Sequence, residues 1–262
     1  MLYATSQPLI ELHPDAIHVE RVSILTLKRL QREMSKAVWR PAPGRGLAFI
    51  VLHYDTLLGL LYLASPIINL GPRNAFLGLS SDPIEKGKQL RNYVDLSVCV
   101  GVQPLAWYWN LGKLCALLAP TLGDVFYSFY QDELKGVITT SLWGKGSQYN
   151  RVYKLLGYTK GYGHEHITTA EYRKMIWWLK REGYGEVSCK SNKRMSNIQR
   201  YVRFSHDETR TPFHGKVRGI YYHAAVDPMS REQVIRDWYE RWGKPRYERK
   251  QFERAPYLTG VE

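Results

Sequence analysis

The sequence is poor in cysteine, which excludes several classes of protein. The three cysteines, Cys99, Cys115 and Cys189, lie far apart, so neither a disulfide framework nor a Cys-x-x-Cys metal site is available. Cys99 and Cys115 lie in apolar segments and are predicted to be core residues. Sparse, unpaired cysteines are typical of a reducing compartment, and we therefore expect a cytoplasmic protein.

Long apolar runs are also missing. The longest apolar stretch, residues 47–68, is interrupted by His53, Asp55, Gly59 and Pro66. No run reaches the ~18 residues that a membrane-spanning helix needs. The first residues lack the basic and apolar segments of a secretory signal peptide. We expect no membrane partner.

Acidic residues are scarce relative to basic ones. The chain of 262 residues has 24 Asp and Glu against 37 Lys and Arg, a net charge of +13. This excess predicts a polyanionic partner, DNA favoured over RNA, although the charge can also serve solubility alone. Aromatic residues are abundant, with 19 Tyr and 8 Trp, and such rings suit half-buried binding surfaces.

The apolar periodicity up to residue 163 predicts an α/β (α+β) fold. A strand–helix–strand–helix–strand run implies a mixed or largely parallel central sheet flanked by helices. We expect strands over residues 47–54, 57–64, 93–100, 125–131 and 158–162. We expect helices over residues 16–38, 83–91, from 105 or 110 to 118, and 147–156.

The composition changes beyond residue 163. Thr168 and Glu171 can form a capping box for a helix over residues 170–182. Residues 189–218 contain eight Lys or Arg and two acidic residues. Further elements are a helix over 193–203, a strand over 220–225 and a helix over 231–242, after which the chain is predicted to be extended. We therefore divide the chain into a catalytic core, 1–163, and a basic C-terminal helical extension, 164–262.

Basic side chains interleaved with aromatic ones can bind backbone phosphates and unstacked bases. An ordinary solvated helix face is the alternative interpretation. The predicted nucleic-acid contacts are Arg73, Lys190, Lys193, Arg194, Arg200, Arg203, Lys216 and Arg218.

The most informative motif lies in residues 143–163, WGKGSQYNRVYKLLGYTKGYG. We expect a helix capped by Ser147 and ended by Gly157. Five residues fit the pattern Asn…Tyr-x-x-Leu-Gly-Phe: Asn150, Tyr153, Leu156, Gly157 and Tyr158. In this motif the chain resembles the GNAT acyltransferase superfamily, which implies a GNAT-like sheet and an acyl donor.

The resemblance also implies a place for that donor. In GNAT proteins the junction after the strand at 93–100 holds the pyrophosphate of acyl-CoA, where free N–H groups at a helix start bind an anion. The usual glycine-rich signature is absent at this junction. Acetyl-CoA is the expected donor and aminoacyl-tRNA the alternative. The donor-binding residues implied are Asn110, Gly112, Lys113, Ser147, Asn150 and Tyr153.

A narrower resemblance, over residues 45–163, is to the Mom family of phage DNA-modification proteins. It rests on Asp95-Leu96-Ser97, on Asn110 with Lys113, on the stretch 128–132 and on Gly146-Ser147-Gln148-Tyr149. Val98 departs from the arginine that the family often has. The resemblance implies transfer of a carbamoylmethyl-type group to adenine, which would protect phage DNA from restriction in the infected cell.

An exocyclic amine of adenine is a poor nucleophile, so it needs a base and donors for the developing oxyanion. Asp132 or Asp95 is the candidate base, and Tyr149 the candidate acid or donor-orienting group. Ser97 and Ser147 are candidate hydrogen-bond donors. We expect the cleft where the strands at 93–100 and 125–131 diverge, with the target base flipped out of the duplex.

Two rival functions remain open. One is a non-catalytic DNA- or RNA-binding protein on a GNAT-like scaffold. The other is an acetyltransferase that acts on a protein or a small amine. The need for a metal is left open, because His164 and His166 are the only close pair of histidines and spacing alone assigns no ligands. The oligomeric state is also left open.

Overall fold

The structure, a computed structural model, describes residues 10–34, 44–141, 147–161, 167–184, 193–207 and 217–258. The chain divides into two units. The larger unit comprises residues 1–141, 146–157 and 220–262, and the smaller unit comprises residues 142–145 and 158–219. Each unit has a hydrophobic core of its own.

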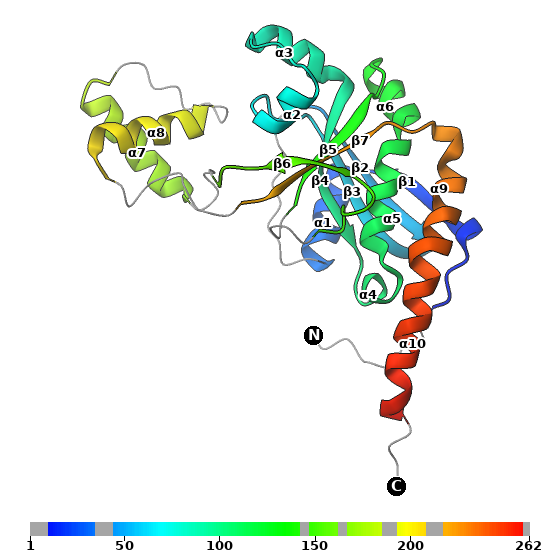
Figure 1. Cartoon of the computed structure of the whole chain (residues 1–262). Helices are drawn as coiled ribbons and strands as arrows, with labels where there is room; N and C mark the ends of the chain where they lie inside the picture. Colours follow the sequence, from blue (N-terminus) through cyan, green and yellow to red (C-terminus); the bar gives the residue numbers. More distant parts are fainter. Residues whose placement is uncertain are drawn as a thin grey trace. The chain divides into compact units, whose positions relative to one another are not determined.

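A seven-stranded mixed sheet, in the order β1-β2-β3-β4-β5-β7-β6, forms the centre of the fold (Figure 1). Strands β1 to β4 are antiparallel neighbours, β4 and β5 are parallel, and β5 and β7 are antiparallel. The predicted α/β class is confirmed. The strands are β1 (Ile17–Val22), β2 (Gly46–His53), β3 (Thr56–Ala64), β4 (Tyr93–Gly101), β5 (Gly136–Thr140), β6 (Lys154–Tyr158) and β7 (Gly219–Ala224).

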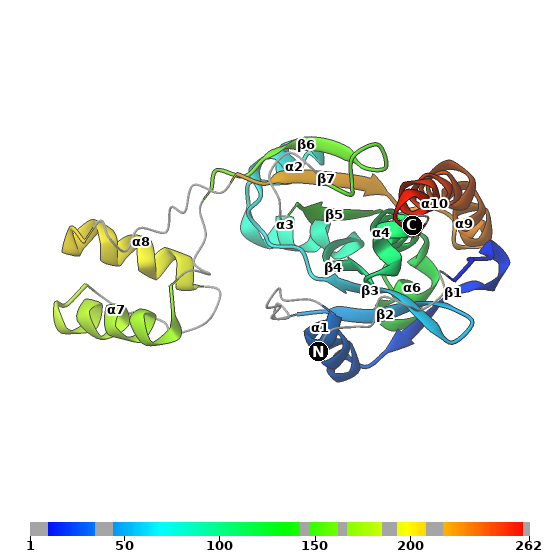
Figure 2. The same ribbon diagram turned by 90° about the horizontal axis from the view of Figure 1, so that it is seen from below.

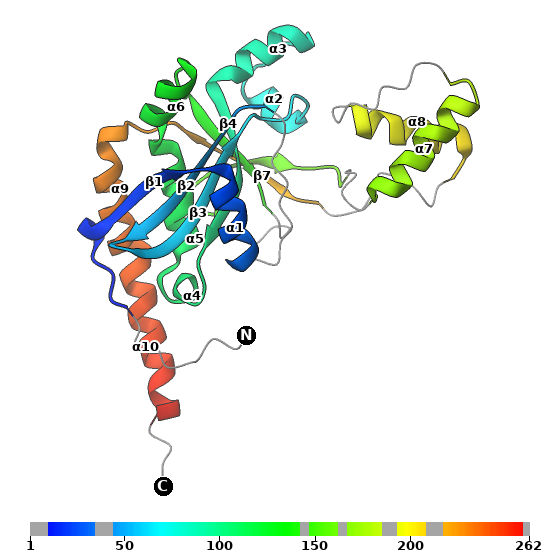
Figure 3. The same cartoon turned by 180° about the vertical axis from the view of Figure 1, so that it is seen from behind.

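Helices cover both faces of this sheet (Figures 2 and 3). On one face Leu27 of α1 packs with Tyr62 and Val98. On the other face Trp109, Leu114 and Trp238 belong to the main core. The helices of the larger unit are α1 (Ile24–Met34), α2 (Gly71–Phe76), α3 (Pro83–Gln89), α4 (Leu105–Trp109), α5 (Leu111–Leu118), α6 (Gly123–Tyr130), α9 (Arg231–Trp238) and α10 (Lys244–Leu258).

An irregularity in β4 decides which side chains share a face. Val98 pairs with Tyr62 of β3, whereas Leu96 pairs with the next residue, Leu63, so Ser97 is an extra residue in β4. Val98 therefore packs on the α1 face, whereas Leu96 packs into the main core on the other face. Asp95 lies on the α1 face, because its partner Ala64 belongs to the cluster on that side.

Two predicted elements are wrong in type. Residues 125–131 are mostly helix α6, because Phe126 and Tyr130 stand at helical spacing, meet edge to face with ring centroids 5.1 Å apart, and pack into the main core. Gln131, with a φ of 55°, ends that helix. Residues 147–156 form turns followed by β6, because Arg151 takes a left-handed backbone conformation that a helix cannot contain.

The two ends of the chain also differ from prediction. Within the predicted helix 16–38, residues 17–22 form β1 instead, paired with β2. At the other end the chain is helical to residue 258, through a π-helical turn at Tyr239–Gly243. Buried Trp238 and the partly buried Tyr239, Trp242 and Tyr247 pack into the main core, which explains why this segment is not extended.

The division of the chain differs from the predicted boundary at residue 163. Strand β7 pairs with β5, and α9 and α10 follow it in the larger unit. The smaller unit is thus an insertion between β6 and β7, because the sheet needs a strand from beyond it. It contains α7 (Thr169–Arg181) and α8 (Arg194–Ser205), and the predicted capping box of Thr168 and Glu171 is confirmed.

Among the described residues, no helix is both long enough and apolar enough to cross a membrane.

Candidate functional site

A basic pocket of about 370 Å³ lies in the larger unit, beside the N-terminus of α5 and along α10. This volume falls within the range typical of small-molecule sites, ~300–1,000 Å³. Five of the lining residues are basic and none is acidic, so the pocket is suited to an anion. It is lined by Asn110, Lys113, Asn150, Arg151, Arg241, Trp242, Pro245, Arg246 and Arg249.

Lys113 holds one wall of the pocket in place. Its Nζ donates hydrogen bonds to the carbonyl oxygens of Gln148, at 3.0 Å, and Asn150, at 2.6 Å. These bonds fix the turn that carries Arg151. Burial lowers the pKa of the Lys113 ammonium, and the neighbouring charge of Arg151 lowers it further. An anionic ligand near Lys113 would favour the charged ammonium and so raise this pKa again.

Two residues of the pocket have an unusual backbone conformation. Asn110 has a φ of 58° and Arg151 a φ of 70°, both in the left-handed region. Asparagine tolerates this region, whereas for arginine the conformation is strained. Strain of this kind costs on the order of 1–3 kcal/mol and concentrates at functional sites. The strained residue, Arg151, is one of the cations that line the pocket.

Trp242 adds an aromatic surface to the charged wall. The Arg241 guanidinium lies 4.6 Å from the centroid of its ring and Lys113 Nζ lies 5.9 Å away. Arg246 is anchored on the carbonyl of Trp107, at 2.6 Å from its Nε. Cations next to an indole form a surface that can bind the phosphates and the base of a nucleotide.

A second feature lies next to the pocket, where β4 and β5 diverge. The two strands pair only over residues 93–95 and 136–138. Beyond that point side chains close the gap. Thr139 Oγ1 donates to the carbonyl of Leu96, at 2.9 Å, and Gln148 Nε2 donates to that of Cys99, also at 2.9 Å.

Tyr149 lies against this gap on the α5 face. Its hydroxyl hydrogen-bonds with the side chains of Thr139, Gln148 and Cys99. Its ring packs against Tyr153 and Tyr221, with centroid distances of 5.4 and 5.5 Å. Burial raises the pKa of the phenol well above its usual range, and Cys99 raises it further. Tyr149 is therefore a neutral hydrogen-bonding group at physiological pH.

Asp95 lies on the opposite face of the sheet, near the buried Arg73. Burial raises the pKa of the Asp95 carboxyl to about 7, and Arg73 opposes that rise. Burial also lowers the pKa of Arg73 to about 10, which Asp95 opposes. Arg73 is fully buried and donates to the carbonyls of Ile67 and Ile68. It is an internal anchor, unlike the surface contact predicted for it.

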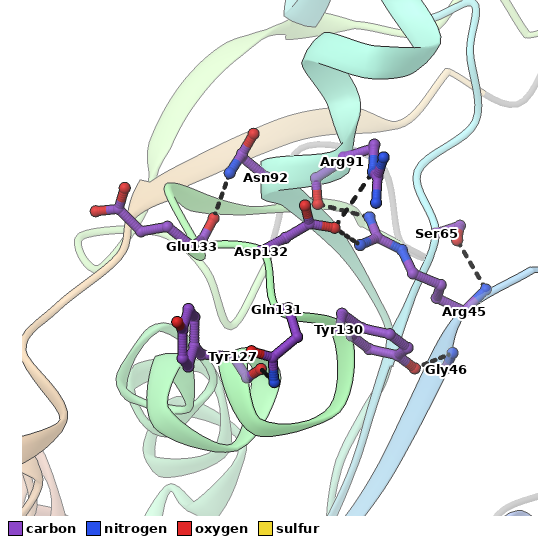
Figure 4. A network of polar contacts seen from close by, with 10 residues as sticks. All are labelled: Arg45, Gly46, Ser65, Arg91, Asn92, Tyr127, Tyr130, Gln131, Asp132 and Glu133. Atoms are coloured by element: carbon purple, nitrogen blue, oxygen red, sulfur yellow. Dashed lines mark hydrogen bonds and ion pairs between the residues drawn. The ribbon is translucent and has the colours of Figure 1, made fainter.

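Asp132 belongs to a separate ion-pair network (Figure 4). Its Oδ2 accepts from Arg45 Nη1, at 2.8 Å, and from Arg91 Nε, at 3.3 Å. Arg45 also donates to the carbonyl of Arg91, and its neighbour Gly46 donates to the hydroxyl of Tyr130. The network fastens the end of α6 to the start of β2, so the structure gives Asp132 a structural role.

The structure brings some predicted donor-binding residues together and separates others. Asn110, Lys113 and Asn150 line the pocket. Gly112 is covered by Gln148, whose Oε1 would lie 2.3 Å from a Cβ at this position. Tyr153 is buried and donates to the carbonyl of Ala116, at 2.9 Å. The Oγ of Ser147 accepts from the backbone of Tyr149, at 3.2 Å.

The predicted catalytic residues do not form one cluster. Asp95 and Tyr149 lie on opposite faces of the sheet, Ser97 is exposed at the extra position of β4, and Asp132 is engaged with two arginines. Sequence reasoning missed the basic residues that complete the pocket. It placed Arg241 in a predicted helix without giving it a role, and it expected the residues beyond 242 to be extended. The signal was a helical spacing of cations along that segment: Arg241, Arg246 and Arg249.

The predicted nucleic-acid contacts of the smaller unit fall into two groups. Lys193 and Arg203 are exposed. Arg194 donates to the carbonyls of Ile167 and Thr168, and Arg200 donates to that of Tyr184. Arg218 is partly buried, and its backbone N–H donates to Thr159 Oγ1. Lys190 and Lys216 lie outside the described residues.

Within the described part of the chain, no three His, Cys, Asp or Glu side chains are grouped as metal ligands. The His164–His166 pair lies outside that part. Cys99 and Cys115 are free thiols; Cys115 is buried, and Cys99 is partly buried against the main core.

No protein-family model matches the chain. It is similar to Druantia protein DruA of Escherichia coli (strain UMEA 4076-1), with 31% identity over 147 residues. The matched region is 47% of this chain and 36% of DruA, so the chain spans only about a third of the length of DruA.

Two solved structures show a distant likeness. One is an IAA acetyltransferase from Bacillus cereus ATCC 14579, with a TM-score of 0.33 and 9% identity over 79% of this chain and 99% of that one. The other is a GNAT family acetyltransferase from Elizabethkingia anophelis with acetyl-CoA bound. Its TM-score is 0.34, with 10% identity over 80% of this chain and 99% of that one. Likeness at these TM-scores carries no conclusion about activity.

The raised pKa of Asp95 predicts a specific pH dependence of stability. The folded protein holds this proton up to about pH 7, whereas the unfolded chain releases it near the ordinary carboxyl pKa of 3.8. The stabilising contribution is thus complete below about pH 4 and is lost as the pH rises through 7. Asp95→Asn cannot titrate. Urea unfolding from pH 4 to 8 should show the variant gaining stability relative to wild type as the pH rises; a constant difference contradicts the assignment.

The network around Asp132 predicts a structural phenotype. Asp132→Asn removes the charge that two guanidinium groups share, which should cost about 1–3 kcal/mol of unfolding free energy. Glu85→Gln is the matched control, because Glu85 pairs with Lys88 at 3.3 Å on an exposed surface. Its cost should stay below about 1 kcal/mol. Equal losses of unfolding free energy in the two variants would show that the network stabilises the fold no more than an exposed ion pair does.

Proposed function

We propose that this chain is a GNAT-like acyltransferase that moves an acyl group from an acyl-CoA donor to a nucleobase amine of DNA, with adenine favoured. The observation that carries the proposal is the basic pocket beside the N-terminus of α5. It lies at the strand-to-helix junction where the GNAT resemblance expects the donor phosphates, and three of the residues expected there line it.

The residues of the pocket fit such a donor. Lys113, Arg151, Arg241 and Arg249 offer positive charge without a competing carboxylate. Trp242 offers a flat surface to an adenine ring. The donor supplies a thioester, whose acyl carbon is open to attack. An aminoacyl-tRNA would also present phosphates to this pocket and remains the alternative donor.

The chain's own residues account for the remaining chemistry. Ser97 is exposed at the extra position of β4, and we assign its hydroxyl to the developing oxyanion. Asp95 has a pKa of about 7, near the value that suits a general base at neutral pH. Tyr149 lies against the gap and acts as a neutral hydrogen-bond donor that orients the acyl donor.

The bonds that form and break in the transfer balance. The amine nitrogen bonds to the acyl carbon, the carbon–sulfur bond breaks, and the thiolate leaves with the donor. The amine proton passes to the Asp95 carboxylate. Asp95 stands at the last paired position before β4 and β5 diverge. For the acceptor amine to reach the donor there, the Thr139 and Gln148 side chains that close the gap must move aside.

The preference for DNA rests on charge. Residues 158–219 carry 13 Lys and Arg against 6 acidic residues, an excess of seven out of the chain's +13. A protein or small-amine substrate would not require this excess. A non-catalytic nucleic-acid-binding protein would share the charge, but it would have no use for a separate anion pocket.

The pocket can be tested by donor binding. Arg241→Gln and Arg249→Gln should each weaken coenzyme A binding about tenfold, because each removes a charged hydrogen-bond donor to phosphate. Isothermal titration calorimetry on the full chain measures this. Arg29→Gln, an exposed arginine of α1, is the matched control and should bind as wild type does. Unchanged affinity in both pocket variants would place the donor elsewhere.

The reaction can be tested by mass spectrometry of nucleosides from cells that express the chain. Wild type should yield a modified deoxyadenosine, and Asp95→Asn should lower its amount at least about 100-fold, the usual contribution of a general base. Lys88→Gln, an exposed lysine of α3, should match wild type. Unmodified nucleosides in wild-type cells would refute DNA modification by this protein.

A further inference from the structure

We propose that the exposed side of α7 in the smaller unit binds single-stranded nucleic acid, with Trp177 stacking on an unpaired base. This inference deepens the proposed function, because it names the surface that would receive the DNA. The surface, called here the α7 stripe, consists of Arg173, Lys174, Trp177, Lys180 and Arg181.

The spacing of these residues places them on one side of the helix. They stand at i, i+1, i+4, i+7 and i+8, which is the period of one α-helical face. All five are exposed, and four of them are basic. The stripe extends over about 12 Å, at 1.5 Å per residue. This length is comparable to a few nucleotides of an extended strand.

Trp177 stands at the centre of the stripe and is 61% exposed. Exposure of this much of a tryptophan is uncommon, because tryptophan usually buries most of its ring. The guanidinium of Arg181 lies 4.7 Å from its centroid and orients the ring. An indole surrounded by cations is the arrangement that stacks on a base while neighbouring phosphates are neutralised.

The apolar side of α7 is not available to a partner. Tyr172, Met175, Ile176 and Leu179 are buried in the core of the smaller unit, where they pack with Ile198 of α8. A helix that lies in a membrane surface would need that apolar side exposed. The stripe itself offers one aromatic residue among charges, which favours a nucleic acid over a lipid surface.

The acidic residues of α7 leave most of this charge uncompensated. Glu171 is engaged in the capping box with Thr168, and Glu182 pairs with Arg181 at 2.6 Å. The arginines of α8 contrast with the stripe. Arg194 and Arg200 donate to carbonyl oxygens of their own unit, so α7 presents more available charge than the helix that sequence reasoning chose.

A single strand fits better than a duplex. An indole can stack only on a base whose face is exposed, as in an unpaired or flipped nucleotide. The stripe carries no asparagine or glutamine, the side chains that pair with adenine edges in a groove. We therefore expect binding that tolerates any sequence and depends strongly on salt.

Fluorescence anisotropy of a labelled 12-nucleotide DNA, titrated with the full chain, tests the proposal. Trp177→Ala should weaken binding about tenfold, within the range of base–aromatic stacking, and Trp177→Phe should restore most of it. The double variant Lys174→Gln, Lys180→Gln should reduce the slope of log affinity against log salt by about 0.7 for each lost phosphate contact.

Matched variants isolate the stripe. Trp107→Ala removes another exposed tryptophan that lies beside a lysine, Lys250, but belongs to the larger unit. The double variant Arg29→Gln, Lys88→Gln removes the same charge from α1 and α3. Both should bind as wild type does. Equal losses in these controls, or an unchanged affinity of Trp177→Ala with its far-ultraviolet circular dichroism intact, would overturn the proposal.

Competition with unlabelled duplex DNA, single-stranded RNA and anionic vesicles identifies the partner. Single strands should displace the probe at lower concentration than duplex. Stronger displacement by duplex or by vesicles contradicts the proposal. The result is independent of the nucleoside analysis: loss of binding in Trp177→Ala with unmodified nucleosides supports the stripe and rejects the enzyme. Modified nucleosides together with unchanged DNA binding by Trp177→Ala support the enzyme and reject the stripe.

Discussion

The arrangement of the larger unit depends on the hydrogen bonds from Lys113 to the turn that precedes β6. The ammonium of Lys113 donates to two carbonyls of this turn, those of Gln148 and Asn150, on either side of Tyr149. With the turn fixed in this way, Tyr149 enters the gap between β4 and β5, and Arg151 points to the pocket in a strained conformation. One cation therefore positions groups on both sides of the turn. A neutral residue at position 113 would leave those carbonyls without their donor and the turn without its anchor.

The second constraint is the return of the chain to the larger unit after the insertion. Strand β7 lies between β5 and β6 in the sheet order, so the sheet is completed only when residues beyond 219 have paired. The helices that follow bring Trp238 into the main core and place Arg241 and Arg249 in the pocket wall. The anion pocket is consequently built from segments that lie more than 100 residues apart. Its formation and the completion of the sheet are coupled.

Much of this architecture was readable from local patterns. Strands β2, β3 and β4 follow from apolar runs bounded by Pro and Gly, and α7 follows from its capping box. The errors have physical causes. The aromatic residues of α6 have high strand propensity, yet Phe126 and Tyr130 pack at helical spacing. The extra residue at Ser97 moves Asp95 and Tyr149 to opposite faces, and no alternation pattern reveals a bulge. Of the pocket, Asn110, Lys113 and Asn150 were foreseen from the motif, whereas the cations of the last helix depended on long-range pairing.

The positive charge of the chain lies in at least three different settings, which composition alone cannot separate. Backbone carbonyls accept hydrogen bonds from Arg73, Arg194 and Arg200, and the carboxylate of Asp132 accepts one from Arg45. Such cations stabilise the fold and are poorly placed to meet a ligand. The pocket cations surround a cavity, and those of the α7 stripe surround an exposed indole. What distinguishes a binding cation from a structural one is therefore the set of acceptors around it. A charged helix supports a functional interpretation when most of its cations are exposed and stand beside an exposed apolar group, as those of α7 stand beside Trp177.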